Sequence, residues 1–530
     1  MTFKKNKYLC LLLSLMLAGV SIFVVSKKQN YAVDEISSFE LANYPGEDFH
    51  LQEDQLYHPA QGDGFKSRVT YQPPTLPWID IMSVHEGHRF DYRNVWQNQA
   101  LDVHPPLYYA LLHTICSFFP GKHSMWYGEA INIIFVLLAL WMFMSLAFRL
   151  TGNSMFTLAV AVFFVVNPGI LKSTALMRMY TMAMFFILWI TNLLIKYHQS
   201  ADQPQIRTLI TIAIATVLGA LTHYYVILFT IVVTATICVI DICHQRYKAL
   251  ISLLTTMIIS GVCALAVFPT MLDHALGSGV HGQNARASFF SLENFPHRMR
   301  LYTTWIDSSV FGFTAIAICV VFIAIVAILL LKKKPLGSLL FENSSWEPWV
   351  ILLVPTLVYF VLVGKTSSYI ADRYMYPIYP FIILCVLYLL FILCRLIHNN
   401  KAQHVTYILL LLGMTTSAYT QSTWGALCII PQEQFSQFEE HKESDAIFIY
   451  KGGWNVYPTL NQVKPLNSLT LYTMDEMDEL RSALDTIDCP FILFVDELTD
   501  TNCVKSQLPD IKFQPICRYG LAHSYIAQKR

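Results

Sequence analysis

Eleven apolar stretches, each long enough to cross a lipid bilayer, run through this chain of 530 residues. A spanning helix needs about 20 mostly apolar residues, so this pattern restricts the fold more than any other feature of the sequence. Charged residues make up 14% of the chain, whereas soluble domains carry about 25%. The sequence therefore predicts a polytopic α-helical membrane protein. The predicted spans lie near residues 8–25, 126–148, 154–171, 178–196, 207–222, 224–242, 249–271, 307–331, 348–364, 377–397 and 404–422.

The first apolar run, Tyr8 to Val25, follows three lysines and suits either a secretory signal or a membrane anchor. It is longer than the core of a signal peptide, which has about 7–15 residues. No clear small-residue cleavage site follows it before Lys27 and Lys28. We therefore predict a helix that is retained in the membrane.

Positive charges decide the orientation of the spans, because Lys and Arg are enriched in cytoplasmic connections. With the N-terminus inside, every inner connection carries such residues. They are Arg149, the connection 196–207, Arg246 and Lys248, Lys332 to Lys334, and Arg395 and Lys401. The prediction is an N-in, C-out, multi-pass protein of about 11 transmembrane helices in the cell membrane, a bacterial plasma membrane. Its net charge of zero gives no electrostatic basis for a nucleic-acid partner.

One apolar run, His104 to Phe119, does not fit this alternation. A full crossing there would invert every later span and place the Lys332 cluster outside. The run has only about 16 residues, and Pro105 and Pro106 suit the start of a helix. We predict an interfacial helix within a large outer loop that covers residues 26–125.

The tail from about residue 423 differs in character from the rest. Asp445–Tyr450 and Phe491–Val495 are predicted as buried strands, and Met474–Leu484 as a charged helix after Thr473. The chain is thus divided into a transmembrane domain, 1–422, and a small extracytoplasmic α/β domain, 423–530. Four cysteines lie in the tail, and the sequence leaves open whether any of them pair: Cys428, Cys489, Cys503 and Cys517.

An acidic pair, Asp34 and Glu35, follows the first span by about nine residues and is placed near the outer membrane surface. A carboxylate there can act as a general base toward an acceptor hydroxyl or amine. The alternative is a solvated acidic pair on a loop, and the pair alone does not decide between them.

The segment Asp102-Val-His104-Pro-Pro places two polar side chains where the interfacial helix begins. Free N–H groups and the helix dipole favour an anion at such a position. The alternative is that Asp102 only caps the helix, and both readings stay open.

Cations and aromatic residues gather in the later outer loops. Lys172 and Arg178 suit a phosphate headgroup, although they can also reach toward lipid phosphates in general. His223 and the tyrosines can contact a sugar or phosphate, or form an aromatic belt. An outward Arg373 departs from the charge rule, and an anionic ligand is one explanation for it. The candidate donor-binding residues are Asp102, His104, Lys172, Arg178, Tyr180, His223, Tyr224, Arg373 and Tyr374.

No cofactor motif is present. The sequence has neither a Walker-type phosphate loop nor a Gly-rich dinucleotide fingerprint, so use of ATP or NAD is not indicated. His85-Glu86-Gly87-His88 does not have the spacing of the helical zinc motif, and no metal site is predicted.

Taken in order, these segments resemble the GT-C membrane glycosyltransferases, in the branch of the protein O-mannosyltransferases and the lipid A aminoarabinose transferase. The resemblance covers roughly residues 1–420. It is carried by Asp34-Glu35, Asp102-Val-His104-Pro105-Pro106-Leu107-Tyr108-Tyr109, Arg178-Met179-Tyr180, Thr222-His223-Tyr224-Tyr225 and Asp372-Arg373-Tyr374.

The resemblance implies transfer of a hexosyl or pentosyl group from a polyprenyl-phosphate sugar to an extracytoplasmic acceptor, without a nucleotide sugar in the site. Asp34 then matches the family's catalytic acidic residue and Glu35 matches its acidic neighbour. The cations of the later loops would hold the lipid phosphate. A divalent metal is not indicated. The long first loop departs from a simple match, because it holds further acids: Glu47, Asp48, Asp80 and Asp91.

The expected chemistry is a single displacement with inversion, in which Asp34 deprotonates the acceptor while cations stabilise the leaving phosphate. A transporter is the first alternative, but it would place polar features near the midplane in paired halves. A scaffold for polysaccharide export that binds through the tail is the second. The sugar stays open, as does the acceptor, which can be a protein, a glycolipid or a wall polymer.

Overall fold

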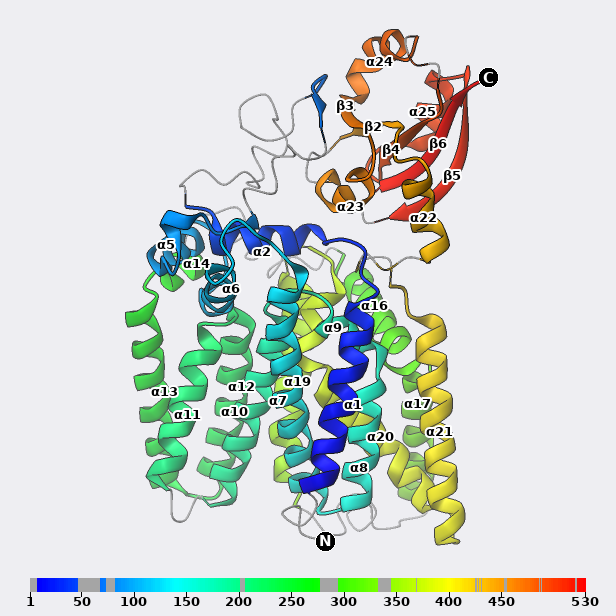
Figure 1. Cartoon of the computed structure of the whole chain (residues 1–530). Coiled ribbons are helices and arrows are strands. Elements are labelled where there is room, and N and C mark those ends of the chain that lie inside the picture. The colour runs from blue at the N-terminus through cyan, green and yellow to red at the C-terminus, as the bar shows by residue number, and fades with distance from the viewer. Residues whose placement is uncertain are drawn as a thin grey trace.

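The structure is a computed structural model. It describes residues 7–45, 67–72, 82–200, 205–276, 294–331, 345–367, 369–424, 427, 429, 431–451, 455–485, 487, 489–519 and 522–530. Long helices stand side by side in a bundle, and a β-sheet with its own helices lies beyond one end (Figure 1). The N-terminus lies at the opposite end of the bundle from the sheet (Figure 1).

Helices of the described chain lie at all eleven predicted places, and the predicted span 154–171 contains two of them. They are α1 (Lys7–Val25), α7 (Met125–Thr151), α8 (Ser154–Val166), α9 (Pro168–Thr174), α10 (Tyr180–Gln199), α11 (Ile206–Ala220), α12 (Tyr224–Cys243), α13 (Tyr247–Val267), α17 (Ala315–Leu331), α19 (Glu347–Thr366), α20 (Tyr379–Arg395) and α21 (Asn400–Gln421). Short helices flank them: α14 (Met271–Leu276), α16 (Phe295–Ile306), the π-helical turn η4 (Asp307–Phe311) and the 3-10 helix η5 (Asp372–Ile378).

Fewer of the described helices than predicted are by themselves long and apolar enough to cross a membrane. Among the described residues, seven helices are long and apolar enough to cross a membrane, or nine if each of two bent pairs counts as one span. The predicted span 154–171 bends by 55° between α8 and α9, where Asn167 caps α9 and Pro168 begins it. The chain also turns by 98° before α17. Helix α11 is short, and α21 carries many polar residues, so neither reaches the length and hydropathy of a full span.

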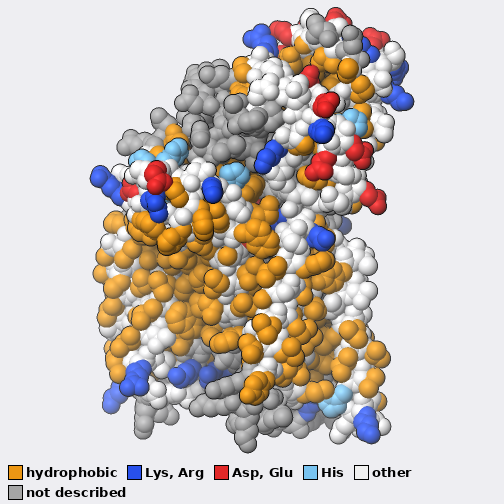
Figure 2. Space-filling model, in the orientation of Figure 1, with side chains coloured by type: hydrophobic (Ala, Val, Ile, Leu, Met, Phe, Trp, Pro, Cys, Tyr) orange, Lys and Arg blue, Asp and Glu red, His pale blue; other side chains and the backbone are white. Residues whose placement is uncertain are grey.

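The surface agrees with an integral multi-pass membrane protein. Figure 2 shows a broad belt of hydrophobic side chains on this face of the bundle, with Lys and Arg at the sheet end and also at the end away from the sheet. Acidic side chains on this face lie beyond the other end of the belt (Figure 2). The Lys332 to Lys334 cluster, as well as Lys4 and Lys5, lies outside the described residues.

Short helices cover the end of the bundle that faces the sheet. Helix α2 (Val33–Asn43) lies across this end and packs against α5 (Tyr92–Leu101) and α6 (Leu107–Ser117) (Figure 1). The α6 segment is the apolar run predicted to be interfacial, and its 11 residues are too few to cross a bilayer. Asn98 of α5 joins α5 to the end of α2 by donating to the Tyr44 carbonyl at 2.8 Å.

The C-terminal domain is a mixed sheet of six strands in the order β1-β3-β2-β4-β6-β5. The strands are β1 (Thr70–Tyr71), β2 (Asp445–Tyr450), β3 (Ser468–Thr473), β4 (Phe491–Asp496), β5 (Ile511–Tyr519) and β6 (Ala522–Lys529). Strands β3, β2 and β4 are parallel, and the outer pairs are antiparallel. The helices are α22 (Gln432–Glu440), α23 (Leu460–Val463), α24 (Met477–Leu484) and α25 (Thr501–Gln507), with 3-10 turns η8 (Tyr457–Thr459) and η9 (Met474–Glu476).

The predicted tail elements are present as β2, β4 and the η9–α24 segment. Strands β3, β5 and β6 were not predicted, and the edge strand β1 comes from the first outer loop. The Thr70 and Thr470 hydroxyls lie 2.9 Å apart across this edge. Cys489, Cys503 and Cys517 are free thiols, and Cys428 lies outside the described residues.

Candidate functional site

Asp34 lies in the first turn of α2, at the end of the bundle that faces the sheet. Its Oδ2 is 3.0 Å from Nη1 of Arg373, which belongs to η5, and 30% of the Asp34 side chain is exposed. Burial opposes the charged carboxylate, but Arg373, Arg178 and His104 outweigh this effect and hold the pKa of Asp34 below its ordinary value. The carboxylate is therefore ionised at neutral pH and still accessible.

Arg178, in the connection between α9 and α10, is buried beside the start of α2. Its Nη1 donates to the Asp34 backbone carbonyl at 3.2 Å and to the Ser38 hydroxyl at 3.1 Å. Its Nη2 lies 3.3 Å from Nε2 of His104. The second cation of the site is thus held against α2 by two contacts and against His104 by a third.

The Asp102–His104 pair lies beside this arginine. Nδ1 of His104 is 2.5 Å from Oδ2 of Asp102. Nδ1 of His104 thus faces the Asp102 carboxylate, and Nε2 faces the Arg178 guanidinium. Burial opposes the charge on Asp102, while His104 and Arg178 lower the pKa of Asp102 below its ordinary value. Asp102 therefore orients His104 and does not cap α6.

Aromatic rings complete the cluster. Tyr180 lies with its ring centre 5.4 Å from that of His223 and 6.0 Å from that of Tyr374. The guanidinium of Arg373 is 5.3 Å from the centre of the Tyr374 ring. His223 caps α12 through Nδ1, and burial, with nearby His104 and Arg178, lowers the pKa of His223 well below its ordinary value. His223 is therefore a neutral member of the site.

Two predicted donor-binding residues lie apart from this cluster. The Tyr224 hydroxyl is 2.6 Å from Nδ1 of His274 and points toward α14. Lys172 of α9 is buried, and its ammonium lies 5.7 Å from the centre of the Trp424 ring. Tyr224 and Lys172 therefore lie outside the cluster. The residues that the contacts join are Asp34, Asp102, His104, Arg178, Tyr180, His223, Arg373 and Tyr374.

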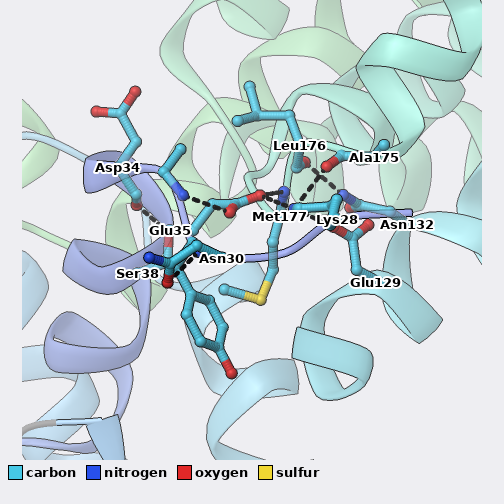
Figure 3. A network of polar contacts seen from close by, with 12 residues as sticks. Lys28, Asn30, Asp34, Glu35, Ser38, Glu129, Asn132, Ala175, Leu176 and Met177 are labelled. Carbon is cyan, nitrogen blue, oxygen red and sulfur yellow. Dashed lines mark hydrogen bonds and ion pairs between the residues drawn. The ribbon is translucent and has the colours of Figure 1, made fainter. Parts of the chain in front are cut away.

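Glu35 points away from Asp34 into a buried ionic network (Figure 3). Its Oε1 accepts from Nζ of Lys28 at 2.5 Å and from the Met177 amide at 2.7 Å, and its Oε2 accepts from the Ala32 amide at 2.8 Å. Nζ of Lys28 also donates to Glu129 of α7 at 2.7 Å. The Lys28 and Glu35 side chains are both fully buried. Glu35 thus ties α2 to the bundle.

Lys28 remains charged at the centre of this network. It donates a third hydrogen bond, to the Ala175 carbonyl, at 2.8 Å. Burial opposes its charge, but Glu129 and Glu35 outweigh burial and raise the pKa of Lys28. Asn132 of α7 holds the same connection by donating to the Leu176 carbonyl at 2.6 Å. The network therefore places Arg178, two residues further on, next to α2.

The sheet domain contacts the chain just before α2. The Asn30 amide donates to the Pro458 carbonyl and, at 3.0 Å, to the Gln462 side chain. The Asn461 amide donates to the Gln29 carbonyl. These contacts lie within a few residues of Asp34, so the sheet domain helps to fix the start of α2.

The part of the chain that the structure describes contains no group of three or more His, Cys, Asp or Glu side chains suited to a metal ion. His88 lies 3.6 Å from Asp91 on the exposed surface. Among the further acids of the first loop, Glu47, Asp48 and Asp80 lie outside the described residues. Sequence reasoning missed Lys28, Glu129 and Asn30 as supports of the site. Glu129 could have been found from the sequence, because it is a charged residue within an apolar span.

Two solved structures similar to this chain are those of ArnT from Cupriavidus metallidurans. The structure bound to undecaprenyl phosphate has a TM-score of 0.45 and 10% sequence identity, and the apo structure has 0.41 and 11%. Each match covers 97% of this chain and 97% of ArnT. No protein-family model and no curated protein matches the sequence. With TM-scores below 0.5, these matches carry no argument about this chain, so its function is argued from its own residues.

Proposed function

We propose that this protein is a membrane glycosyltransferase that moves a sugar from a polyprenyl-phosphate donor to an acceptor outside the cytoplasm. The observation that carries the proposal is the position of Asp34. Its accessible, ionised carboxylate lies beside Arg373 and Arg178, which come from distant segments, at the end of an apolar bundle. A base next to two cations suits a displacement in which a phosphate leaves.

In this reaction Asp34 removes the proton from the acceptor hydroxyl or amine, and the acceptor atom attacks the anomeric carbon. The bond between that carbon and the phosphate oxygen breaks, and the phosphate leaves with the electron pair. Arg373 and Arg178 stabilise the negative charge on the phosphate. Attack opposite the leaving group inverts the anomeric carbon.

The donor follows from the resemblance to the GT-C family and from the location of the site. A carrier with its chain in the bilayer would present its phosphate at the end of the hydrophobic belt. With the N-terminus inside, in the predicted topology of about 11 spans, this end faces outward. Tyr180, Tyr374 and His223 would contact the sugar or phosphate, and the Asp102–His104 pair would hold Arg178.

Glu35 is assigned a positioning role in this scheme. Both of its oxygens accept hydrogen bonds within a fully buried network, so it has no accessible atom for an acceptor. It holds α2 in the orientation that presents Asp34. Lys172, whose ammonium lies beside the Trp424 ring, is assigned to a second phosphate contact.

The direct test is incubation of membranes containing the protein with radiolabelled polyprenyl-phosphate sugars and envelope acceptors. We expect release of polyprenyl phosphate together with labelled acceptor, and an inverted anomeric linkage in the product. Movement of intact donor across the membrane without cleavage would instead indicate a transporter. Membranes lacking the protein provide the background.

The substitution Arg373→Lys tests the role of the planar cation. Lysine keeps the positive charge but loses the paired N–H donors that match a phosphate. We expect kcat to fall about tenfold, which corresponds to roughly 1.4 kcal/mol of transition-state stabilisation. Arg395→Lys, in the last turn of α20, is the matched control. Unchanged kcat in Arg373→Lys would remove Arg373 from the reacting site.

A further inference from the structure

A pocket of about 520 Å³ lies at the junction between the bundle and the sheet domain. One wall is the chain that follows α1, including Lys27 and Gln29, and the other comes from α22 and α23. Figure 1 shows α22 and α23 facing the end of the bundle at which α1 finishes. The pocket is separate from the proposed reacting site, because none of its lining residues belongs to the Asp34 cluster.

The pocket carries a positive charge. Lys27 and Lys464 line it, both side chains are exposed, and neither forms an ion pair with a described residue. Lys28 also lines it, but its charge is already matched by Glu35 and Glu129. Glu439 is the one acidic residue in the lining. Two available ammonium groups against one carboxylate favour an anionic occupant.

The level of the pocket relative to the membrane indicates the source of that anion. Lys27 follows the last turn of α1, and its ammonium lies 5.2 Å from the centre of the Phe23 ring. Phe23 is 61% exposed on the hydrophobic belt, so it faces lipid chains. A lysine directly above such a residue lies at the level of lipid headgroups. The volume is in the range of sites that hold a whole headgroup.

We propose that this pocket binds the phosphate headgroup of an anionic membrane lipid, with Lys27 and Lys464 as its cationic contacts. The two lysines belong to different domains, so a bound headgroup bridges the bundle and the sheet domain. Next to the pocket, Asn461 already donates to the Gln29 carbonyl. Bound lipid therefore stabilises the junction that fixes the start of α2. The proposal does not depend on the chemistry assigned to Asp34.

The test measures binding of phosphatidylglycerol to the full-length protein in phosphatidylcholine nanodiscs, from the increase in melting temperature with phosphatidylglycerol content. The double variant Lys27→Gln/Lys464→Gln is compared with Lys505→Gln/Lys512→Gln, which removes the same charge from the sheet domain outside the pocket. We expect the apparent affinity to fall about thirtyfold in the first variant only, as expected for loss of two surface lysines.

Equal losses in both variants would show a general charge effect and overturn the proposal, as would unchanged affinity in the pocket variant. A third arm adds inorganic phosphate to pure phosphatidylcholine nanodiscs. If millimolar phosphate stabilised the wild type as much as phosphatidylglycerol, with the same dependence on Lys27 and Lys464, the occupant would be a soluble phosphate and the lipid assignment would fail. Transferase activity is not a readout, so failure of the proposed function is a separate result.

Discussion

Asp34→Asn is expected to reduce sugar transfer by about 10²- to 10⁴-fold, the range typical for loss of a general base. Asparagine has nearly the shape of aspartate but cannot accept a proton at neutral pH. The wild-type carboxylate is ionised there because Arg373 and Arg178 hold the pKa of Asp34 below its ordinary value. Loss of activity through protonation of Asp34 is therefore expected only below about pH 4.

The measurement is kcat for release of polyprenyl phosphate, with thermal unfolding in detergent as the check on folding. Asp91→Asn is the matched control, because Asp91 is another acid of the first outer loop and lies beside His88 and Asn94. We expect Asp91→Asn to keep wild-type activity. Full activity of folded Asp34→Asn would contradict the assignment, and a large loss in Asp91→Asn would show that the base lies elsewhere.

Lys28→Met is expected to destabilise the fold by about 3–5 kcal/mol, the usual cost of removing one partner from a buried ionic group. The substitution leaves Glu35 and Glu129 facing each other without a cation, in a site from which water is excluded. It also removes the donor to the Ala175 carbonyl. Most of the protein should therefore misfold or aggregate on extraction from the membrane.

Monodispersity after extraction and the thermal midpoint measure this effect. Lys27→Met, measured in detergent without added lipid so that the proposed headgroup site is empty, is a close control, since Lys27 is the exposed neighbour with no ion pair among the described residues. A triple variant with Lys28→Met, Glu35→Gln and Glu129→Gln removes all three charges and is expected to recover part of the stability. If Lys28→Met were as stable as Lys27→Met, the network would have no structural role.

Local properties of the chain were sufficient to predict much of the fold. The helices lie where hydropathy predicts them, and α6 is short where the charge pattern argued against a crossing. Strands β2 and β4 were visible as short apolar runs. Strands β5 and β6 were missed because they contain many polar residues and pair with each other at the edge of the sheet.

The candidate site was predictable only in part. Charged residues in outer loops stood out against an apolar background, so Asp34, Arg178 and Arg373 could be selected one by one. The roles of neighbours could not be separated in this way. Asp34 and Glu35 are adjacent and chemically alike, yet one is accessible and the other is enclosed by Lys28, Ala32 and Met177.

The sequence by itself determined that this is a multi-pass membrane protein, which end of each helix carries its charges, and which residues could do chemistry. These properties depend on composition and spacing over one or two turns. Only the tertiary structure decided which charges meet. Lys28 pairs with Glu129, Asn30 donates to Gln462, and β1 pairs with β3, which lies far from it in the sequence. Such contacts come from packing between distant segments, and no local pattern specifies them.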